Sequence, residues 1–277
     1  MMLVQSKMTC WGNGVMEHCK NKLNHHSSTP VRQYSSSNSS PLRAFLIFYI
    51  VILSLVVASS SFAALGFEPW EDEVFVAIGR EYGPEAEKRF RRIMEIILAN
   101  HDKPVLEKLK LTNDTLNNIP WIADPDLWKR EDYWATPFET LATFGGDCED
   151  IAFAKYGMLL MMGVPDNSMG FAYVENQGKE RHMVLIYREN ENSPVYVLDN
   201  EIPEVLTGPE RRDLTAIYIF QSDGRLYIIG DDGKKRYVKQ EFTGRRFEKW
   251  ITGKERAREN RKKYEKYNGN RPLFPDN

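Results

Sequence analysis

The chain has 277 residues, of which 42% are hydrophobic, and a formal net charge of -2 at neutral pH. This composition excludes an intrinsically disordered chain and suits one large globular domain or two small ones. The charge is uneven, because residues 65–230 carry 30 acidic against 17 basic side chains while both ends are basic. Such an acidic centre argues against nucleic acid as the main partner and favours a bound cation.

The first part of the chain has two segments of contrasting composition. Residues 1–43 are polar, rich in serine and without hydrophobic period, so we expect a disordered extension. Residues 44–65 form an uncharged apolar run directly after Arg43, which is the layout of a signal peptide. The run is also long enough for a membrane anchor. In both cases the chain after residue 65 is exported.

The three cysteines fall on different sides of this apolar run. Cys10 and Cys19 precede it, so Cys148 is the only cysteine of the exported part and has no partner there for a disulfide. A lone cysteine in an exported chain is either a reactive thiol or a buried small hydrophobe. The count alone leaves both interpretations open.

Helical spacing of apolar residues dominates the first half of the exported part. We expect a helical region over residues 68–100, interrupted near Gly83-Pro84, and a second helix over residues 104–118. Residues 121–137 form an aromatic-rich loop. Within it, Trp134 is a candidate either to line a cleft and donate its indole N–H to an oxyanion, or to pack in the core.

The segment GGDCEDIAFAKY, residues 145–156, begins another helix. Asp147 is a candidate N-cap, Asp150 lies three residues later as in a capping box, and Gly163 is a candidate end. Cys148 therefore falls in the first helical turn. There the helix dipole and the free backbone N–H groups lower the pKa of a thiol and bind an oxyanion.

After residue 165 the apolar pattern alternates with a period of two, which predicts strands at residues 169–175, 181–188, 194–200, 213–220 and 224–230. If residues 188–193 form the loop between the second and third strands, Tyr187 faces Pro194 and His182 faces Asp199. A helical pattern resumes at residues 245–263, and we expect residues 263–277 to be a flexible tail.

Three side chains then form a candidate catalytic group. Cys148 at a helix start, His182 on a strand and Asp199 on the next strand are the nucleophile, base and orienting acid of thiol catalysis. Taken alone, His182 is more often a structural histidine, and Asp199 is more often a turn residue. Their conjunction with a single thiol favours catalysis.

The acidic neighbours of the thiol need a separate explanation. Asp147, Glu149 and Asp150 oppose ionisation of Cys148, because a nearby negative charge disfavours an anion. A divalent cation would cancel this effect, and oxygen ligands without a second cysteine favour calcium over zinc or copper. The alternative is that Asp147 and Asp150 only cap the helix and that Glu149 is solvated.

Four blocks in order resemble a known family: DYWATPFETLATFGGDCEDIAFAKY at residues 132–156, RHMVLIYR at 181–188, VLDN at 197–200 and RRDLTAIYIF at 211–220. They are similar to the bacterial transglutaminase-like cysteine proteinases of the LapG type. The resemblance implies an α+β papain/transglutaminase-like fold, with the catalytic-cysteine helix packed on an antiparallel sheet, spanning residues 66–262. It also implies a Cys148, His182 and Asp199 triad.

The resemblance implies calcium (Ca²⁺) held through Asp147 and Glu149, with Asp166 and Asn167 as further candidate ligands. It implies a periplasmic enzyme, either free or anchored in the inner membrane, that cleaves a large surface adhesin near its N-terminus and releases cells from a biofilm. An inner-membrane receptor for cyclic di-GMP would be its inhibitor. We therefore expect an exported, calcium-dependent cysteine endopeptidase. The alternatives are an acyl transferase or amidase with the same triad, and a non-catalytic binding module.

Overall fold

The computed structural model describes residues 46, 48, 68–177, 180–229, 235–238 and 245–274. Residues 46 and 48 are helical and belong to a unit of residues 1–49, whereas all other described residues belong to the unit of residues 50–277. The predicted extension of residues 1–43 and nearly all of the apolar run therefore lie outside the described residues. Within the described part, no helix has both the length and the apolar character that a bilayer crossing requires.

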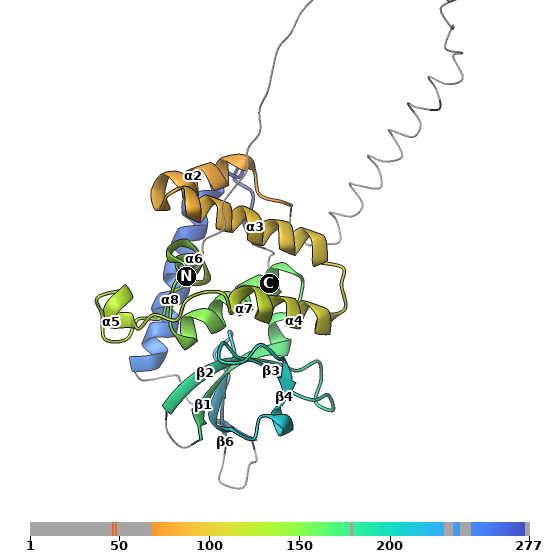
Figure 1. Ribbon diagram of the computed structural model, residues 1–277, viewed down its shortest axis with the longest axis vertical. Coiled ribbons are helices and arrows are strands. Elements are labelled where there is room, and N and C mark those ends of the chain that lie inside the picture. The colour runs from red at the N-terminus through yellow and green to blue at the C-terminus, as the bar shows by residue number, and fades with distance from the viewer. Residues whose placement is uncertain are drawn as a thin grey trace, which may run out of the picture. The chain divides into compact units, whose positions relative to one another are not determined.

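Helices and a sheet form the unit that follows the apolar run (Figure 1). The helices are α2 (Asp72–Tyr82), α3 (Pro84–Asn100), α4 (Val105–Leu116), α5 (Asp124–Leu127), α6 (Pro137–Thr143), α7 (Cys148–Met161) and α8 (Arg245–Glu265), with short 3-10 turns η1 (Asp166–Ser168) and η2 (Gly208–Glu210). The predicted interruption near residue 83 is confirmed. Gly83 has a φ of 91° between α2 and α3, and Pro84 begins α3.

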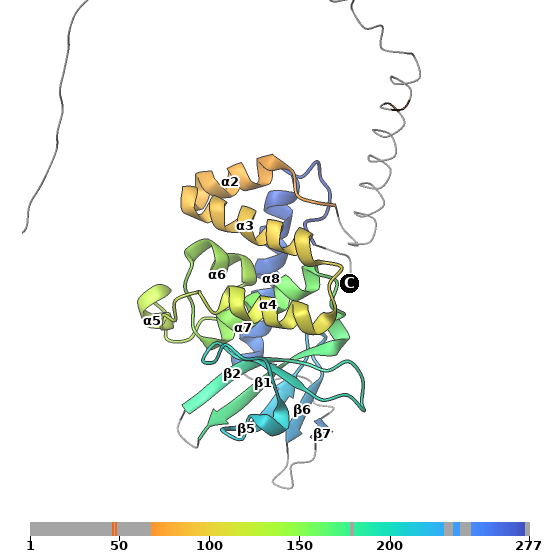
Figure 2. The ribbon, with the colours of Figure 1, turned by 45° about the vertical axis from the view of Figure 1, so that its right-hand side comes forward.

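Seven strands within the described residues form one antiparallel sheet in the order β4-β3-β2-β1-β5-β6-β7. They are β1 (Met169–Asn176), β2 (Glu180–Tyr187), β3 (Tyr196–Leu198), β4 (Leu206–Thr207), β5 (Leu214–Phe220), β6 (Leu226–Ile229) and β7 (Lys235–Val238). Figure 2 shows the helices on one side of this sheet. The predicted fold class, an α+β fold with the cysteine helix packed on an antiparallel sheet, is confirmed.

Helix α7 lies between two hydrophobic cores, which explains why its sequence is apolar around most of its circumference. Ile151 and Met158 face a core shared with α2 and α3. Phe153 and Leu159 face a second core, which includes Phe171 of β1 and other residues of the sheet. Because both sides are buried, the position of the first turn of α7 is fixed relative to the sheet.

The hairpin of β2 and β3 has a different register from the predicted one. Tyr187 pairs with Tyr196 rather than with Pro194, so the connection is two residues longer than expected. Pro194 has no N–H to donate to a ladder, and Val195 offers its carbonyl to Gly208 N instead. Since side chains alternate with a period of two, this shift leaves Asp199 on the predicted face of the sheet.

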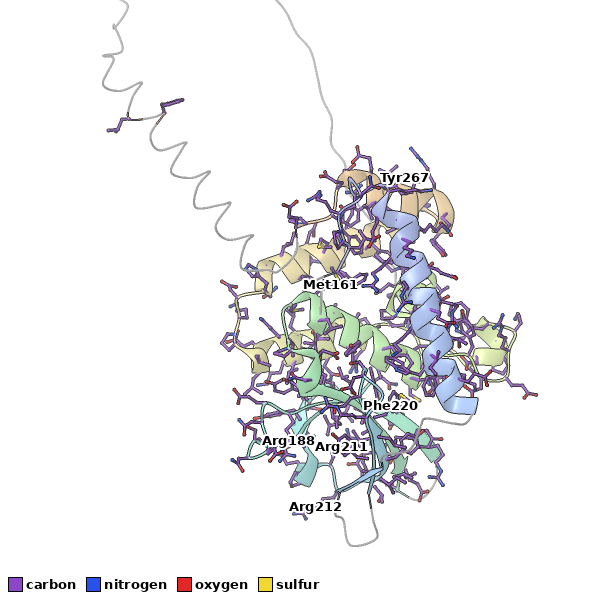
Figure 3. The ribbon with its side chains drawn as sticks, turned by 180° about the vertical axis from the view of Figure 1, so that it is seen from behind. Met161, Arg188, Arg211, Arg212, Phe220 and Tyr267 are labelled. Atoms are coloured by element: carbon purple, nitrogen blue, oxygen red, sulfur yellow. The ribbon has the colours of Figure 1, made fainter. Side chains whose placement is uncertain are left out.

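The C-terminal segment packs against the start of the domain instead of forming a loose tail. Figure 3 shows α8 running toward α2, with Tyr267 beyond its end. Asn268 is fully buried, and its side-chain oxygen accepts the backbone N–H of Glu71 at 2.9 Å. Trp70 donates its indole N–H to the carbonyl of Leu273 at 2.7 Å. The two ends of the domain are therefore joined.

Phe153 provides a test of how strongly the sheet-side core holds α7. Its ring lies 4.8 Å from Phe171 and 5.2 Å from Trp250, measured between centroids. Phe153→Ala should lower the free energy of unfolding by about 3–5 kcal/mol, because it opens a cavity. Phe144→Ala, at a ring that is 37% exposed, should cost about 1 kcal/mol or less. Urea denaturation measures both, and equal losses would contradict the packing described.

Candidate active site and metal site

Cys148 is the first residue of α7, as the sequence predicts. The chain reaches it through Gly145 and Gly146, where no side chain fits. A Cβ on Gly145 would lie 2.7 Å from Ile122 Cδ1, and a Cβ on Gly146 would lie 2.6 Å from Asp150 Cβ. The two glycines therefore allow the loop of residues 120–124 to pack directly against the start of α7.

The thiol of Cys148 lies between a carboxylate and the sheet-side core. It donates a hydrogen bond to Glu149 Oε2 at 2.8 Å. The core against which it packs includes Met183 of β2, the neighbour of His182. Burial, followed by the charges of Glu149 and Asp147, raises the pKa of the Cys148 thiol well above its usual value. In this arrangement the thiol keeps its proton.

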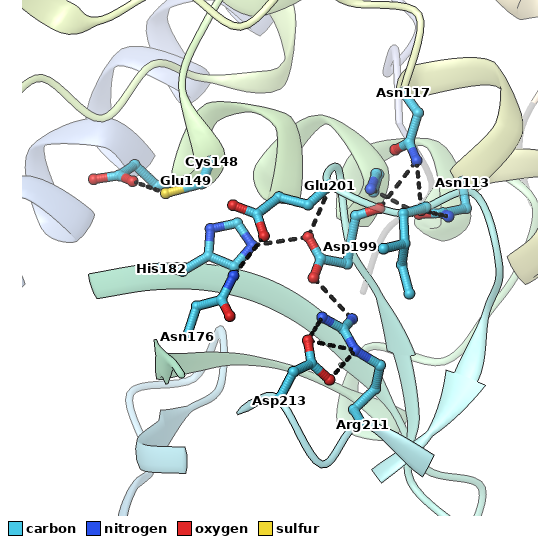
Figure 4. Close-up of polar contacts among 12 residues, drawn as sticks. Asn113, Asn117, Cys148, Glu149, Asn176, His182, Asp199, Glu201, Arg211 and Asp213 are labelled. Carbon is cyan, nitrogen blue, oxygen red and sulfur yellow. Dashed lines mark hydrogen bonds and ion pairs between the residues drawn. The ribbon is translucent and has the colours of Figure 1, made fainter. Parts of the chain in front are cut away.

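His182 and Asp199 meet in the buried part of the site. His182 Nε2 lies 2.8 Å from Asp199 Oδ1, and the two residues are 5% and 0% exposed. In Figure 4 the imidazole lies between the Cys148 sulfur and the Asp199 carboxylate. Because Asp199 occupies Nε2, Nδ1 is the ring nitrogen left for the thiol. The structure thus brings the three predicted residues to one place.

Asp199 is held by positive charge and backbone donors. Arg211 Nη1 lies 2.8 Å from Asp199 Oδ2 as an ion pair, although its N–H does not point along a hydrogen-bond line. The N–H of Glu201 donates to Oδ1 at 2.9 Å. Burial alone would raise the pKa of Asp199, but the hydrogen bonds with His182 and Glu201 and the ion pair with Arg211 outweigh it and lower the pKa to about 2. Asp199 is therefore a stable anion.

The buried Lys155 lies near enough to the Asp199 carboxylate for their charges to interact. Lys155 of α7 is 1% exposed and donates to Asn113 Oδ1 at 2.7 Å. Asn113 in turn donates to the carbonyls of Ile202 and Pro203, in the loop that follows Asp199. Burial lowers the pKa of Lys155 to about 7, and the nearby charge of Asp199 opposes this shift. These contacts fix the loop against α4 and α7.

Carboxylates gather on the other side of the thiol. One oxygen from each of Asp124, Asp147 and Asp150 lies within 4.8 Å of the others, and donor atoms of Asp147, Cys148 and Glu149 meet the same limit. Burial first, and then neighbouring negative charges, raise the pKa of Asp147, that of Asp150 to about 8 and that of Asp124 to about 6. Asp124 Oδ1 and Asp147 Oδ1 are buried without a hydrogen-bond partner.

These oxygens fit a hard cation. Unpartnered buried carboxylate oxygens are costly, and calcium takes ligands of this type. The simpler interpretation, that the acids only cap α7, is not what the structure shows. Asp147 occupies the N-cap position but forms no side-chain capping bond. Asp150 accepts from Ala135 N and Trp128 Nε1 instead of reaching back to residue 147.

Other candidates lie away from this group. Trp134 is 5% exposed and packs against Phe153 and Phe220, so it has a packing role. Asp166 accepts from Tyr156 and Ser222 and is not part of the carboxylate group, and its neighbour Asn167 is not part of it either. A cavity of about 570 Å³ between α6, α7 and α8 is lined by Trp134 and Asp166 but by none of the three predicted catalytic residues.

Sequence reasoning missed four side chains of the site. Asp124 lies within the predicted aromatic-rich loop, 23 positions before Asp147, and Lys155 is one polar position in an apolar helix. Arg211 and Asn113 carry no local signal. The charged residue at position 155, on a helix that is otherwise apolar, was the one usable hint, since a buried lysine needs a partner.

The chain is similar to a known protein family and to several solved structures. The family model of the bacterial transglutaminase-like cysteine proteinases (BTLCP) matches residues 81–211. LapG of Legionella pneumophila is similar in its calcium-bound and its EGTA-treated structures. Each has 27% sequence identity, a TM-score of 0.56 and coverage of 68% of this chain and 99% of that chain. Another LapG structure has 28% identity, a TM-score of 0.56 and coverage of 67% and 95%. No curated protein matches the chain.

The fold and the cysteine helix define a transglutaminase-like cysteine protease. Within that class, the family model and the LapG structures support the bacterial transglutaminase-like cysteine proteinase family, LapG type.

The buried Lys155 predicts a pH-dependent stability. Its folded pKa of about 7 is below the unfolded value of about 10.4. Between these values only the unfolded chain binds a proton at this side chain, so the contribution of Lys155 to the free energy of unfolding should rise from pH 7 to pH 10 and stay level below pH 7. Lys155→Met should remove this rise, which is on the order of 3 kcal/mol.

Lys88→Met is the matched control, because Lys88 has the same charge on an exposed side chain. It should keep the wild-type slope. Urea denaturation at pH 7, 8.5 and 10 compares the three chains, and a Lys155→Met slope equal to that of the wild type would contradict the burial of an uncharged amine.

Proposed function

We propose that this chain is an exported, calcium-dependent cysteine endopeptidase that cleaves a large bacterial surface adhesin near its N-terminus. One observation carries the proposal: Cys148 packs against the core that includes Met183, and the adjacent residue His182 is hydrogen-bonded to Asp199 (Figure 4). A thiol, an imidazole and a carboxylate in this order are the parts of a thiol protease. The match to a cysteine proteinase family supports the same reaction.

The proposed reaction uses groups of the chain itself. His182 Nδ1 takes the proton of Cys148, and the thiolate sulfur attacks the carbonyl carbon of the scissile bond. Backbone N–H groups at the start of α7 donate to the resulting oxyanion. His182 then gives its proton to the leaving amine, the C–N bond breaks, and a thioester remains. A water molecule, deprotonated by His182, hydrolyses the thioester. Asp199 keeps the imidazole oriented and stabilises its charged form.

A bound calcium ion would offset the negative charges that disfavour ionisation of the Cys148 thiol. Asp147 and Glu149, together with Asp124 and Asp150, would hold the ion, and the bound ion would supply the positive charge that the thiolate lacks. Two of these carboxylates have buried oxygens without a partner. Glu149 also accepts a hydrogen bond from the Cys148 thiol. If Glu149 bound the ion instead, the thiol would be free to donate to His182. The calcium-bound and EGTA-treated structures of Legionella LapG support calcium as the ion.

The apolar run and the family type support a location and a set of partners for this chain. We propose export to the periplasm through residues 44–65, either as a signal peptide or as an inner-membrane anchor. The proposed inhibitor is an inner-membrane receptor that responds to cyclic di-GMP. Release of the adhesin would detach cells from a biofilm.

Removal of the thiol tests the proposed reaction. Cells that carry Cys148→Ala should stop shedding the surface protein that wild-type cells release, because no nucleophile remains. Sequencing the N-terminus of the shed protein locates the cleavage site. The side chain is small and partly buried, so the melting temperature of the variant should stay close to that of the wild type. Continued shedding by a folded variant would overturn the proposal, and incorporation of a labelled amine would favour acyl transfer.

Two aspartates of the same helix test the calcium site. Asp124 is buried within the carboxylate group, whereas Asp126 is exposed and makes no side-chain contact in the described structure. Asp124→Asn should raise the calcium concentration needed for half-maximal activity by about 10-fold or more. Asp126→Asn should leave it unchanged. Calcium titration calorimetry provides an independent affinity, and activity that persists in excess EGTA would contradict a role for the ion.

A further inference from the structure

Residues 117–124 connect two parts of the site, the Asp199 loop and the carboxylate group beside Cys148. At one end Asn117 donates its side-chain amide to the carbonyl of Asp199 at 3.0 Å. At the other end Asp124 joins the carboxylate group beside Cys148. Trp121 lies between these two anchors. The segment is therefore anchored both at Asp199 and at the carboxylates beside Cys148.

Trp121 is fixed by a short parallel bridge to Gly146, two residues before Cys148. Ile122 N donates to the Gly146 carbonyl at 2.9 Å, and Gly146 N donates to the Pro120 carbonyl at 3.4 Å. Successive peptide groups of an extended segment point to opposite sides. The N–H and C=O of Trp121 itself therefore point away from Gly146.

That outward edge is unpaired. Within the described part of the chain, neither the N–H nor the C=O of Trp121 has a hydrogen-bond partner. Trp121 is 61% exposed. An unpaired edge is a template for another extended segment. Exposed tryptophan, a residue enriched among binding hot spots, offers apolar surface beside this edge.

Close packing supports the edge from behind. Ile122 packs onto the glycine of position 145 so closely that a Cβ there would lie 2.7 Å from Ile122 Cδ1. The neighbouring Gly146 is equally enclosed, with Asp150 Cβ 2.6 Å from the position of an added Cβ. A binding edge that is already in place spares the ordering cost that a flexible loop would incur on binding.

We propose that Trp121 is a substrate-binding residue, which pairs through its backbone N–H and C=O with an extended stretch of the substrate polypeptide. The indole covers an apolar or small side chain of that stretch. The inference rests on the proposed protease function and specifies its substrate class: the scissile bond lies in an extended, unfolded segment with apolar or small side chains. Acidic side chains there would meet the carboxylates around Cys148 and be repelled.

The test compares two reagents that alkylate Cys148 in the calcium-loaded protein. Iodoacetamide needs only the thiolate, whereas acetyl-trialanine chloromethyl ketone also presents an extended backbone; in each case the sulfur displaces the halide. Trp121→Ala should slow inactivation by the peptide reagent about 10-fold and leave the iodoacetamide rate within about 2-fold. Leu106→Ala, a truncation at an exposed apolar residue of α4, should change neither rate.

The backbone pairing has its own test on the unaltered chain. Replacing one alanine of the peptide reagent by lactic acid removes a single N–H and adds no bulk. At one position this change should slow inactivation about 5-fold, since one hydrogen bond to the Trp121 carbonyl is lost. At the other positions the rate should stay within about 2-fold of the parent reagent.

Three outcomes would overturn the inference. An unchanged peptide-reagent rate in Trp121→Ala removes the role of the indole, and an equal response at every lactic acid position removes the backbone pairing. In both cases normal alkylation by iodoacetamide leaves the proposed protease function standing. A wild-type Cys148 that does not react with iodoacetamide would overturn the protease function, and the inference with it.

Discussion

Buried negative charge around the first turn of α7 is the constraint on which the rest of this structure depends. The fold places Asp124, Asp147, Glu149 and Asp150 about a thiol that has to ionise, and it leaves two of their oxygens without a partner. A helix N-terminus normally favours a thiolate. Here the local carboxylates outweigh that effect, and the pKa of Cys148 is raised. In the proposed mechanism, the nucleophile therefore depends on the added positive charge of a bound cation.

The opposite side of the site has the reverse balance. Asp199 lies among Arg211, Lys155 and His182, and its pKa is lowered to about 2, whereas the pKa of Asp150 is raised to about 8. Environments that push similar groups apart assign different roles to them. Asp199 is a permanent anion suited to orienting an imidazole. The carboxylates beside the thiol are suited to binding a cation. One sheet and one helix thus carry both environments within a single site.

The sequence predicted what depends on local pattern and missed what depends on distant neighbours. Punctuation around residue 148 located the start of α7, and the period-two pattern located β2 with His182. The hairpin register was wrong by two residues, because the length of an irregular loop is not encoded by alternation, yet the face was right. Asp124, Asn113 and Arg211 were missed because each reaches the site from a remote segment. The proposed triad was recognisable because cysteine and histidine are rare after residue 65, where the chain has one cysteine and two histidines.

The joined ends of the domain have a mechanical consequence. Trp70 and Glu71 are held by Leu273 and Asn268 through hydrogen bonds of 2.7 and 2.9 Å, and Arg271 contacts Glu68 and Glu71. A load applied at residue 68 is therefore shared at once with α8, the longest helix described, rather than passed along α2 alone. Tension on the chain before residue 68 would have to break these contacts before it could move α7. The geometry around Cys148 is therefore protected from pulling on that end of the domain.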